Sequence, residues 1–215
     1  MSKDTRFDRV SETVRSVQPL PKIELFKQHS FVLVAGSSYS EEANLINRFL
    51  DLHPDTNIKI IIAPHEIDQA HLDEVKNLFS EKSICFYSTA SDSDLFSSKV
   101  LVIDNIGLLS SIYQYASIAL IGGGFGRKGL HNTLEAATFG MPILFGPNNH
   151  QKFPESIQLI ENGSAFTIHN SDEFEKILLE FITDKLKLEE VSLRSKTFIN
   201  SNTGATDVIL SKLTF

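Results

Sequence analysis

Glycine, asparagine and glutamate residues in the second half of the chain have types and spacing suited to binding a phosphate or a sugar. The stretch Gly124-Phe-Gly126-Arg-Lys-Gly129 has the spacing G-x-G-x-x-G, between an apolar run and a helical pattern. Asn132 and Glu135 follow, three residues apart. Glycines leave room for backbone to approach a ligand, a helix start favours anions, and a glutamate accepts hydrogen bonds from sugar hydroxyls. The stretch is therefore a candidate for a dinucleotide site or for a site that holds another phosphate.

The residues after the glycines argue against a dinucleotide. Such a site needs an acidic residue about 20 residues further on, at the end of the next strand. Here the next expected strand ends in Gly146-Pro-Asn-Asn-His150, which contains no carboxylate. The spacing Asn132-x-x-Glu135 is also that of a helix cap. A capping role therefore stays open beside a role in binding a ligand.

A second loop of similar character lies near the start of the chain. Gly36-Ser37-Ser38 follows an apolar strand-like run and precedes a helical pattern. Backbone amides and two hydroxyls suit a phosphate, although a serine there is also an ordinary helix cap. Two such loops at one edge of one sheet would together favour a phosphate site.

Strand-length apolar runs alternate with helical patterns along the whole chain. Most of the runs are apolar on both faces, which is typical of a parallel sheet covered by helices on both sides. We expect an α/β fold, a Rossmann-like doubly wound parallel sheet of about six strands. Strand patterns fall at 31–35, 58–63, 84–87, 100–103, 117–121, 142–145 and 165–168. Helical patterns fall at 41–52, 65–79, 105–115, 131–139, 153–161, 172–183, 186–198 and 206–213.

Composition and charge exclude several classes of protein. A length of 215 residues suits one domain, and a net charge of -7 argues against non-specific binding to nucleic acid. Cys85 lies in an apolar run and is expected to be a core residue in a reducing compartment. The histidines lack the spacing of zinc ligands, and Asp92-Ser-Asp94 lies in a serine-rich loop, so we expect no metal and no cofactor. Neither a signal peptide nor a membrane span is evident, so we expect a soluble, cytoplasmic chain.

Short motifs after the expected strands match, in order, the motifs of one enzyme family. They are Gly36-Ser-Ser, Glu41-Glu42, Pro64-His65, Asp104-x-x-Gly107-x-Leu109, Gly122-Gly-Gly, His131-Asn-x-Leu-Glu135-x-Ala137, Gly140-x-Pro142 and Phe145-Gly-Pro147. This series resembles the carboxyl-terminal half of the 3-deoxy-D-manno-octulosonic acid (Kdo) transferases. Thr5-Arg-Phe-Asp8 resembles the segment that links the two halves of that family. The resemblance implies that 1–21 is an interdomain linker segment, that 22–215 is a CMP-sugar-binding Rossmann-like domain, and that the amino-terminal acceptor domain is absent.

The resemblance also implies an activity. Members of the family have the GT-B architecture and move Kdo from CMP-Kdo to a lipid A precursor, with inversion, in lipopolysaccharide biosynthesis. The full-length protein would act at the cytoplasmic face of the inner membrane. The general base of the family is a glutamate in the other half, so no catalytic residue is expected in this chain, and the isolated domain is expected to be inactive. Its partners would be CMP-Kdo, its own amino-terminal domain and, through that domain, the lipid A precursor.

The family's site residues map onto this sequence by their motifs. The implied donor-binding residues are Ser37, Ser38, Gly123 and Asn132 at the phosphate, Glu135 at the ribose, Pro64 and His65 at the cytosine–ribose end, and Gly107 where backbone packs close to the nucleotide. One departure concerns charge, since many members have an arginine between the proline and the histidine of the second loop. Arg127 and Lys128 could replace that cation, or could belong to a solvated loop.

Three alternatives and one further expectation remain. Another GT-B enzyme, either a UDP-sugar transferase or an epimerase, would share much of this pattern, and so would a non-catalytic nucleotide-binding module. Without the other half, a face of the domain would be exposed, and apolar side chains on it would drive self-association. The candidates are Phe125, Ile209, Leu210 and Leu213.

Overall fold

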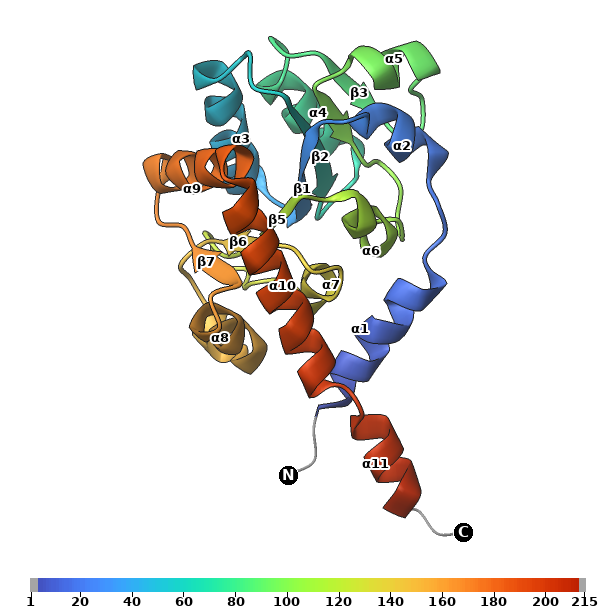
Figure 1. Ribbon diagram of the computed structural model, residues 1–215. Coiled ribbons are helices and arrows are strands. Elements are labelled where there is room, and N and C mark those ends of the chain that lie inside the picture. Colours follow the sequence, from blue (N-terminus) through green and yellow to red (C-terminus); the bar gives the residue numbers. More distant parts are fainter. Residues whose placement is uncertain (1–3, 213–215) are drawn as a thin grey trace.

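The computed structural model of the chain describes residues 4–212 and contains one parallel sheet (Figure 1). The order of its seven strands is β3-β4-β2-β1-β5-β6-β7, and every neighbouring pair is parallel. The strands are β1 (Phe31–Ser38), β2 (Ile58–Pro64), β3 (Ile84–Phe86), β4 (Val100–Val102), β5 (Ile118–Ile121), β6 (Ile143–Phe145) and β7 (Ala165–Thr167). The expected doubly wound α/β fold is confirmed. Seven strands replace the expected six or so, because the short edge strand β7 also pairs with β6.

Helices cover both faces of the sheet, which explains why the central strands are mostly apolar. All four residues of β5 are buried, and so are the first six of β2. On one face the core contains side chains from α3 (Ser40–Leu52) and α9 (Ser171–Thr183), with α4 (Gln69–Leu78) packed against it. The other face is covered by α1 (Thr5–Ser16), α2 (Pro21–Lys27), α5 (Asp92–Ser97), α6 (Leu109–Ile112), α7 (Leu134–Thr138) and α8 (Pro154–Glu161). The remaining helical elements are α10 (Lys185–Asn202), α11 (Ala205–Lys212) and the 3-10 turns η1 (Tyr113–Tyr115) and η2 (His150–Lys152).

The segment 1–21, expected to be a linker, contains a helix that packs on the rest of the domain. Phe7 of α1 is buried and meets Phe198 of α10 edge-on, with ring centroids 5.5 Å apart. Asp8 accepts hydrogen bonds from the backbone N–H groups of Gly204 (2.6 Å) and Thr206 (2.7 Å), at the start of α11. In Figure 1, α1 and the end of α10 converge beside α11. This segment therefore joins both ends of the described chain, and its role as a connection to another domain stays a prediction.

The chain changes direction in the sheet between β1 and β5. From β1 the chain builds one side of the sheet through β2, and it then crosses to build the other side from β5. In doubly wound sheets such a switch point opens a crevice beyond the carboxyl ends of the strands, where ligands bind. The end of β1 and the loop after β5 meet at this point. Gly36-Ser37-Ser38, expected from the sequence to be a loop, forms the last three residues of β1, and Tyr39 alone separates this strand from α3.

Among the helices of residues 4–212, none combines the length and the apolar character that crossing a bilayer requires.

Candidate functional site

The end of β1 and the loop after β5 are in direct contact at the switch point. The N–H of Gly122 donates to the carbonyl of Gly36 at 2.9 Å. The register between β1 and β2 shifts there, and Ser37 adopts a positive φ of 50°, which is uncommon for a residue other than glycine. A Cβ on Gly122 would lie 1.9 Å from the carbonyl oxygen of Ser37. Only glycine therefore allows the two loops to approach this closely.

The next two glycines are also explained by contacts within the protein. Gly123 has a φ of 86°, and a Cβ there would lie 2.0 Å from the carbonyl oxygen of Gly129. A Cβ on Gly124 would lie 2.5 Å from the backbone nitrogen of Gly146, in the loop after β6. These glycines pack backbone against backbone, so the expectation that they make room for a ligand is not needed to explain them.

Glu42, in the first turn of α3, connects the same two loops from below. It is fully buried, and its Oε1 accepts the N–H of Gly123 at 2.9 Å while its Oε2 accepts the N–H of Tyr39 at 2.8 Å. Burial raises the pKa of Glu42 to about 7, and the two amide hydrogen bonds oppose that rise. The amide of Gly123, expected to face a phosphate, is thus occupied by a carboxylate of the protein.

The position of Glu42 in the sequence indicates that it is buried. Glu42 precedes Ile46 by four residues and Phe49 by seven, which puts it on the buried face of α3. A glutamate on an apolar helix face must find hydrogen-bond donors in the interior. The N–H of Tyr39, three residues away, is a local donor, but the sequence could not identify Gly123 as the second donor, because it lies 81 residues away.

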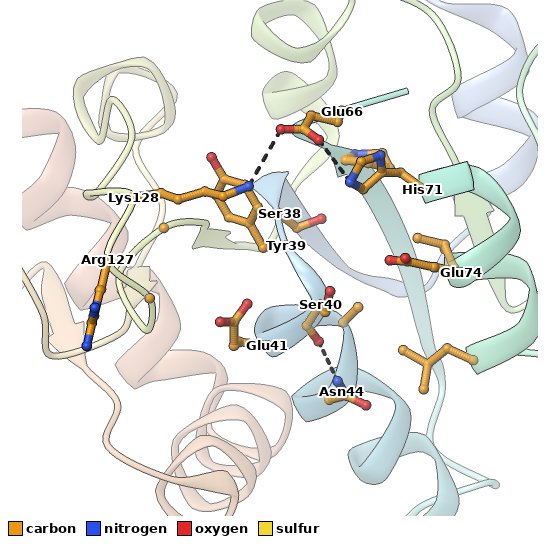
Figure 2. A pocket seen from close by; sticks show the side chains of 16 residues that line it. Ser38, Tyr39, Ser40, Glu41, Asn44, Glu66, His71, Glu74, Arg127 and Lys128 are labelled. Carbon is orange, nitrogen blue, oxygen red and sulfur yellow. Dashed lines mark hydrogen bonds and ion pairs between the residues drawn. The ribbon is translucent and has the colours of Figure 1, made fainter. Parts of the chain in front are cut away.

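Two cavities at this edge bear on the site, and the larger, with a volume of about 600 Å³, opens beside these loops (Figure 2). It is bounded by the ends of β1 and β2, the start of α3, one side of α4, and the loop between β5 and α7. Its lining is strongly charged and includes Glu41, Glu66, Glu74, His71, Arg127 and Lys128. Carboxylates and cations in one cavity suit a ligand that carries both hydroxyls and a negative charge.

Arg127 and Lys128, in the loop between β5 and α7, differ in their contacts with the protein. Lys128 lies over the ring of Tyr39, 4.5 Å from its centroid, and 3.5 Å from a carboxylate oxygen of Glu66. Figure 2 shows Lys128 extending toward Glu66, while Arg127 extends in another direction. Arg127 has no ion-pair partner within residues 4–212. Both side chains line the larger cavity. Their contact with a ligand stays a prediction.

A histidine and two carboxylates lie close together at the rim of the larger cavity. The ligand atoms of Glu66, Asp68 and His71 lie within 4.8 Å of one another, a separation that a metal ion could bridge. They already satisfy one another, since His71 contacts Asp68 at 2.6 Å and Glu66 at 2.8 Å. The hydrogen bond raises the pKa of His71 and lowers that of Asp68. These ion pairs account for the cluster without a metal, and the expectation that the chain binds no metal stays a prediction.

Three rings from three loops stack at the same edge. The ring centroids of His65 and His131 are 4.6 Å apart, and that of Tyr39 is 4.9 Å from His65. The hydroxyl of Tyr39 lies 3.0 Å from Nε2 of His131. Burial, and then the neighbouring His65, lower the pKa of His131, which favours its neutral form. His131 thus links Tyr39, which lines the larger cavity, to the adjacent Asn132.

A smaller cavity of about 430 Å³ contains the Asn132–Glu135 pair. Asn132 accepts the N–H of Leu134 at 3.0 Å and donates to Oε1 of Glu135 at 2.9 Å. Asn132 therefore supports the start of α7, which begins at Leu134 and is shorter than the expected helix 131–139. Oε2 of Glu135 makes no hydrogen bond within the part of the chain that the structure describes. That oxygen is available to a ligand hydroxyl.

Helix α1 forms the opposite wall of the smaller cavity, a contribution that the sequence did not suggest. Arg6 and Arg9 line it together with Glu155 of α8. Arg6 is engaged, since its guanidinium binds both carboxylate oxygens of Glu155 at 2.9 and 3.1 Å. Arg9 is exposed and has no ion-pair partner among residues 4–212. The cavity therefore offers one uncommitted cation beside Glu135.

The predicted donor-binding residues all lie at the carboxyl edge of the sheet, but in separate groups. The larger cavity is lined by Ser38, Pro64 and Gly123, the smaller by Asn132 and Glu135, and the remaining three are Ser37 at the register shift after Gly36, His65 in the ring stack and Gly107 after β4. Gly107 has a φ of 88° and open space around its Cα, so it is a turn residue with an accessible backbone. The structure thus brings the loops to one edge and divides their side chains between two cavities.

The fold and the position of these cavities define a class of protein. The fold is that of the carboxyl-terminal half of GT-B glycosyltransferases. The C-terminal CMP-Kdo binding domain of WaaA from Acinetobacter baumannii matches 90% of this chain and 98% of its own, with a TM-score of 0.72 and 17% identity. UDP-GlcNAc 2-epimerase from Neisseria meningitidis matches 99% of this chain and 54% of its own, with a TM-score of 0.67 and 15% identity.

Curated relatives of this chain are enzymes of one name. The chain is 29% identical to 3-deoxy-D-manno-octulosonic acid transferase from Aquifex aeolicus, over 76% of this chain and 46% of that protein. It is 27% identical to the enzyme of the same name from Rickettsia conorii, over 92% of this chain and 43% of that protein. The resemblance to the Kdo transferases is therefore confirmed, and the chain spans less than half the length of these relatives. No family model matches the chain.

Proposed function

We propose that this chain is the donor-binding domain of a Kdo transferase, which moves Kdo from CMP-Kdo to a lipid A precursor, with inversion, in lipopolysaccharide biosynthesis. The observation that carries the proposal is that the predicted donor-binding loops meet at the switch point between β1 and β5. The name of the curated relatives supports the transfer reaction. The description of the A. baumannii domain supports CMP-Kdo as the donor.

The nucleoside is proposed to bind on the side of the smaller cavity. Oε2 of Glu135 accepts a ribose hydroxyl, and the exposed backbone around Gly107 lies against the base. The hydroxyls of Ser37 and Ser38 and the amide of Asn132 donate to the phosphate. Gly123 contributes through the shape of its loop, since its N–H is engaged by Glu42.

The sugar is proposed to extend toward the larger cavity. Kdo is an acidic sugar, so it carries a carboxylate as well as several hydroxyls. Arg127 and Lys128 supply positive charge for the carboxylate, while Glu41 and Glu66 accept hydrogen bonds from hydroxyls. Pro64, which lines the larger cavity, and His65, in the ring stack, contact the cytosine–ribose end where it approaches this cavity.

The other parts of the reaction are proposed to belong to the rest of the full-length protein. An inverting transfer needs a base that takes the proton of the acceptor hydroxyl and groups that stabilise the leaving phosphate. This chain supplies the second, without a metal or cofactor, and an amino-terminal acceptor domain supplies the first. Residues 1–21 connect the two, with 22–215 as the donor-binding unit. The full-length protein acts at the cytoplasmic face of the inner membrane, and this chain alone binds the donor without transferring it.

Calorimetric titration with CMP tests the proposal. We expect the wild type to bind CMP and Glu135→Ala to bind it about tenfold more weakly, since it loses one hydrogen bond to the ribose. Glu161→Ala, which removes an exposed carboxylate at the end of α8, serves as the matched control and should bind as the wild type does. An absence of heat with CMP, or equal affinities for all three proteins, contradicts the proposal.

A comparison of CMP with UDP distinguishes the proposed Kdo transferase from a UDP-sugar enzyme of the same fold. The likeness to UDP-GlcNAc 2-epimerase favours an enzyme that uses a UDP-sugar. In a thermal-shift measurement, we expect CMP to raise the melting temperature more than UDP does. A larger effect of UDP would favour the UDP-sugar enzyme, and no effect of either would contradict both nucleotide-sugar enzymes.

A further inference from the structure

A buried carboxylate lies beneath the two loops that form the proposed donor site. Glu42 is fully buried, and each of its oxygens accepts one backbone N–H: that of Gly123 after β5 and that of Tyr39 after β1. Both of these residues also line the larger cavity. One side chain therefore connects two walls of the cavity that come from distant parts of the sequence.

The ionised form of Glu42 is the form that satisfies both contacts. A carboxylate accepts at both oxygens, so each N–H has a partner. A protonated carboxyl has an O–H donor on one oxygen, and a glutamine has an NH₂ group there. Either would turn a donor toward an N–H of one loop and lose a hydrogen bond. The loops after β1 and β5 are therefore held together fully only when Glu42 is charged.

We propose that Glu42 is a positioning residue for the donor, whose carboxylate holds the loops after β1 and β5 in their binding arrangement, so that donor affinity depends on its ionisation. The identity of the ligand as the donor rests on the proposed function. The contact between the loops can be tested without a ligand. Glu42 acts through the backbone of Tyr39 and Gly123 and is not itself expected to touch the nucleotide.

The charge of Glu42 changes near neutral pH. Burial raises its pKa to about 7, and the charge of Glu41 on the same turn adds to the rise. The amides of Tyr39 and Gly123 oppose it. Glu42 is therefore mostly neutral at pH 6 and mostly ionised at pH 8, and donor affinity should increase as pH rises through this range.

Other titratable and charged groups face the same edge and must be separated from Glu42. They are Glu41 of α3, Tyr39 after β1, His65, Glu66 and Asp68 after β2, His71 and Glu74 of α4, and Arg127, Lys128 and His131 after β5. The hydrogen bond to Asp68 raises the pKa of His71, so this imidazole must also be separated from Glu42. A change in affinity caused by the histidines persists when Glu42 is replaced, whereas a change caused by Glu42 disappears.

The test measures CMP affinity between pH 6 and pH 8.5 for the wild type, Glu42→Gln and a control. Asp172→Asn is the matched control. It removes an exposed carboxylate of α9 that pairs with Arg48 of α3, the helix that contains Glu42. We expect wild-type affinity to increase about tenfold across pH 7, the effect of one hydrogen bond. Glu42→Gln should bind about tenfold more weakly than the wild type at pH 8 and should lack this step, while Asp172→Asn keeps it.

Nuclear magnetic resonance of the wild type tests the contact independently of ligand and of the folding of any variant. The amide nitrogens of Gly123 and Tyr39 should shift together with pH, with a midpoint near that of Glu42. Flat amide shifts, or a Glu42→Gln variant that binds like the wild type at every pH, overturn the inference. If the amides titrate but the wild type does not bind CMP at any pH, the loop contact stands, and the proposed function and the link to donor affinity both fall.

Discussion

Single residues at the switch point combine roles that the sequence suggests only in part. Asn132 supports the start of α7 through the N–H of Leu134 and also orients Glu135 through its amide. The capping and binding interpretations are therefore compatible, because one side chain offers both an acceptor and a donor. The second carboxylate oxygen of Glu135 is left for a ligand. A residue in this position can serve the fold and the site together.

The glycines of the loop after β5 differ in how much space surrounds them. A Cβ on Gly122 would lie 1.9 Å from the carbonyl oxygen of Ser37, whereas a Cβ on Gly126 would lie 3.5 Å from a side-chain oxygen of Glu41. We expect Gly122→Ala to lower the free energy of unfolding by about 1–3 kcal/mol, or more, because the two loops must separate. Gly126→Ala should have little effect. Urea denaturation of the two variants compares them, and equal losses would contradict the packing argument.

At the scale of secondary structure, α1 is part of the domain and part of the smaller cavity. Its buried side chains pack on α7 and α10, and Asp8 holds the start of α11. Backbone hydrogen bonds to Asp8 lower its pKa, which favours the charged form that accepts them. Arg9, on the same helix, faces the region proposed for the nucleotide. The helix thus connects packing of the chain ends to the candidate site.

Truncation of one side chain tests the attachment of α1. Phe7 is only 4% exposed and meets Phe198, whereas Phe96 is 60% exposed. We expect Phe7→Ala to lower the free energy of unfolding by about 3 kcal/mol, since it leaves a cavity in the core. Phe96→Ala, the same change at an exposed position, should cost less than about 0.5 kcal/mol. Thermal unfolding of both variants measures this, and a Phe7→Ala protein as stable as the wild type would show that α1 is dispensable.

At the scale of the whole molecule, α11 extends away from the sheet (Figure 1). It carries exposed apolar side chains. Val208, Ile209 and Leu210 are 45%, 40% and 59% exposed. Of the other residues expected to favour self-association, Phe125 is partly buried against the core, and Leu213 lies outside the described residues. Of the residues expected to favour self-association, Ile209 and Leu210 are therefore the exposed ones within the described chain.

Light scattering over a range of concentrations tests self-association. We expect the apparent mass of the wild type to rise with concentration and that of an Ile209→Ser, Leu210→Ser double variant to stay at the value of a monomer, because apolar surface is removed. Replacing the more buried Phe125 by serine should leave the rise in place if the protein stays folded. A wild type that remains a monomer at high concentration would contradict the prediction.

The sequence determined the fold class and the edge of the sheet that carries the candidate site. Apolar strands alternating with amphipathic helices indicate a parallel sheet covered on both faces, and the carboxyl ends of such strands meet at one edge. The strand patterns at 31–35, 58–63 and 117–121 correspond to β1, β2 and β5. Gly36-Ser-Ser after the first and Gly122-Gly-Gly after the third mark the segments that meet. These features are local, so the order of residues along the chain is sufficient to find them.

Only the tertiary structure decided which groups at that edge are free to bind a ligand. It assigned the amides of Tyr39 and Gly123 to Glu42, placed Arg9 beside Glu135, and divided the predicted residues between two cavities. Each of these facts joins segments that are far apart in the sequence. Hydrogen bonding and burial depend on distance in space, and residue types and spacing along the chain do not contain that distance.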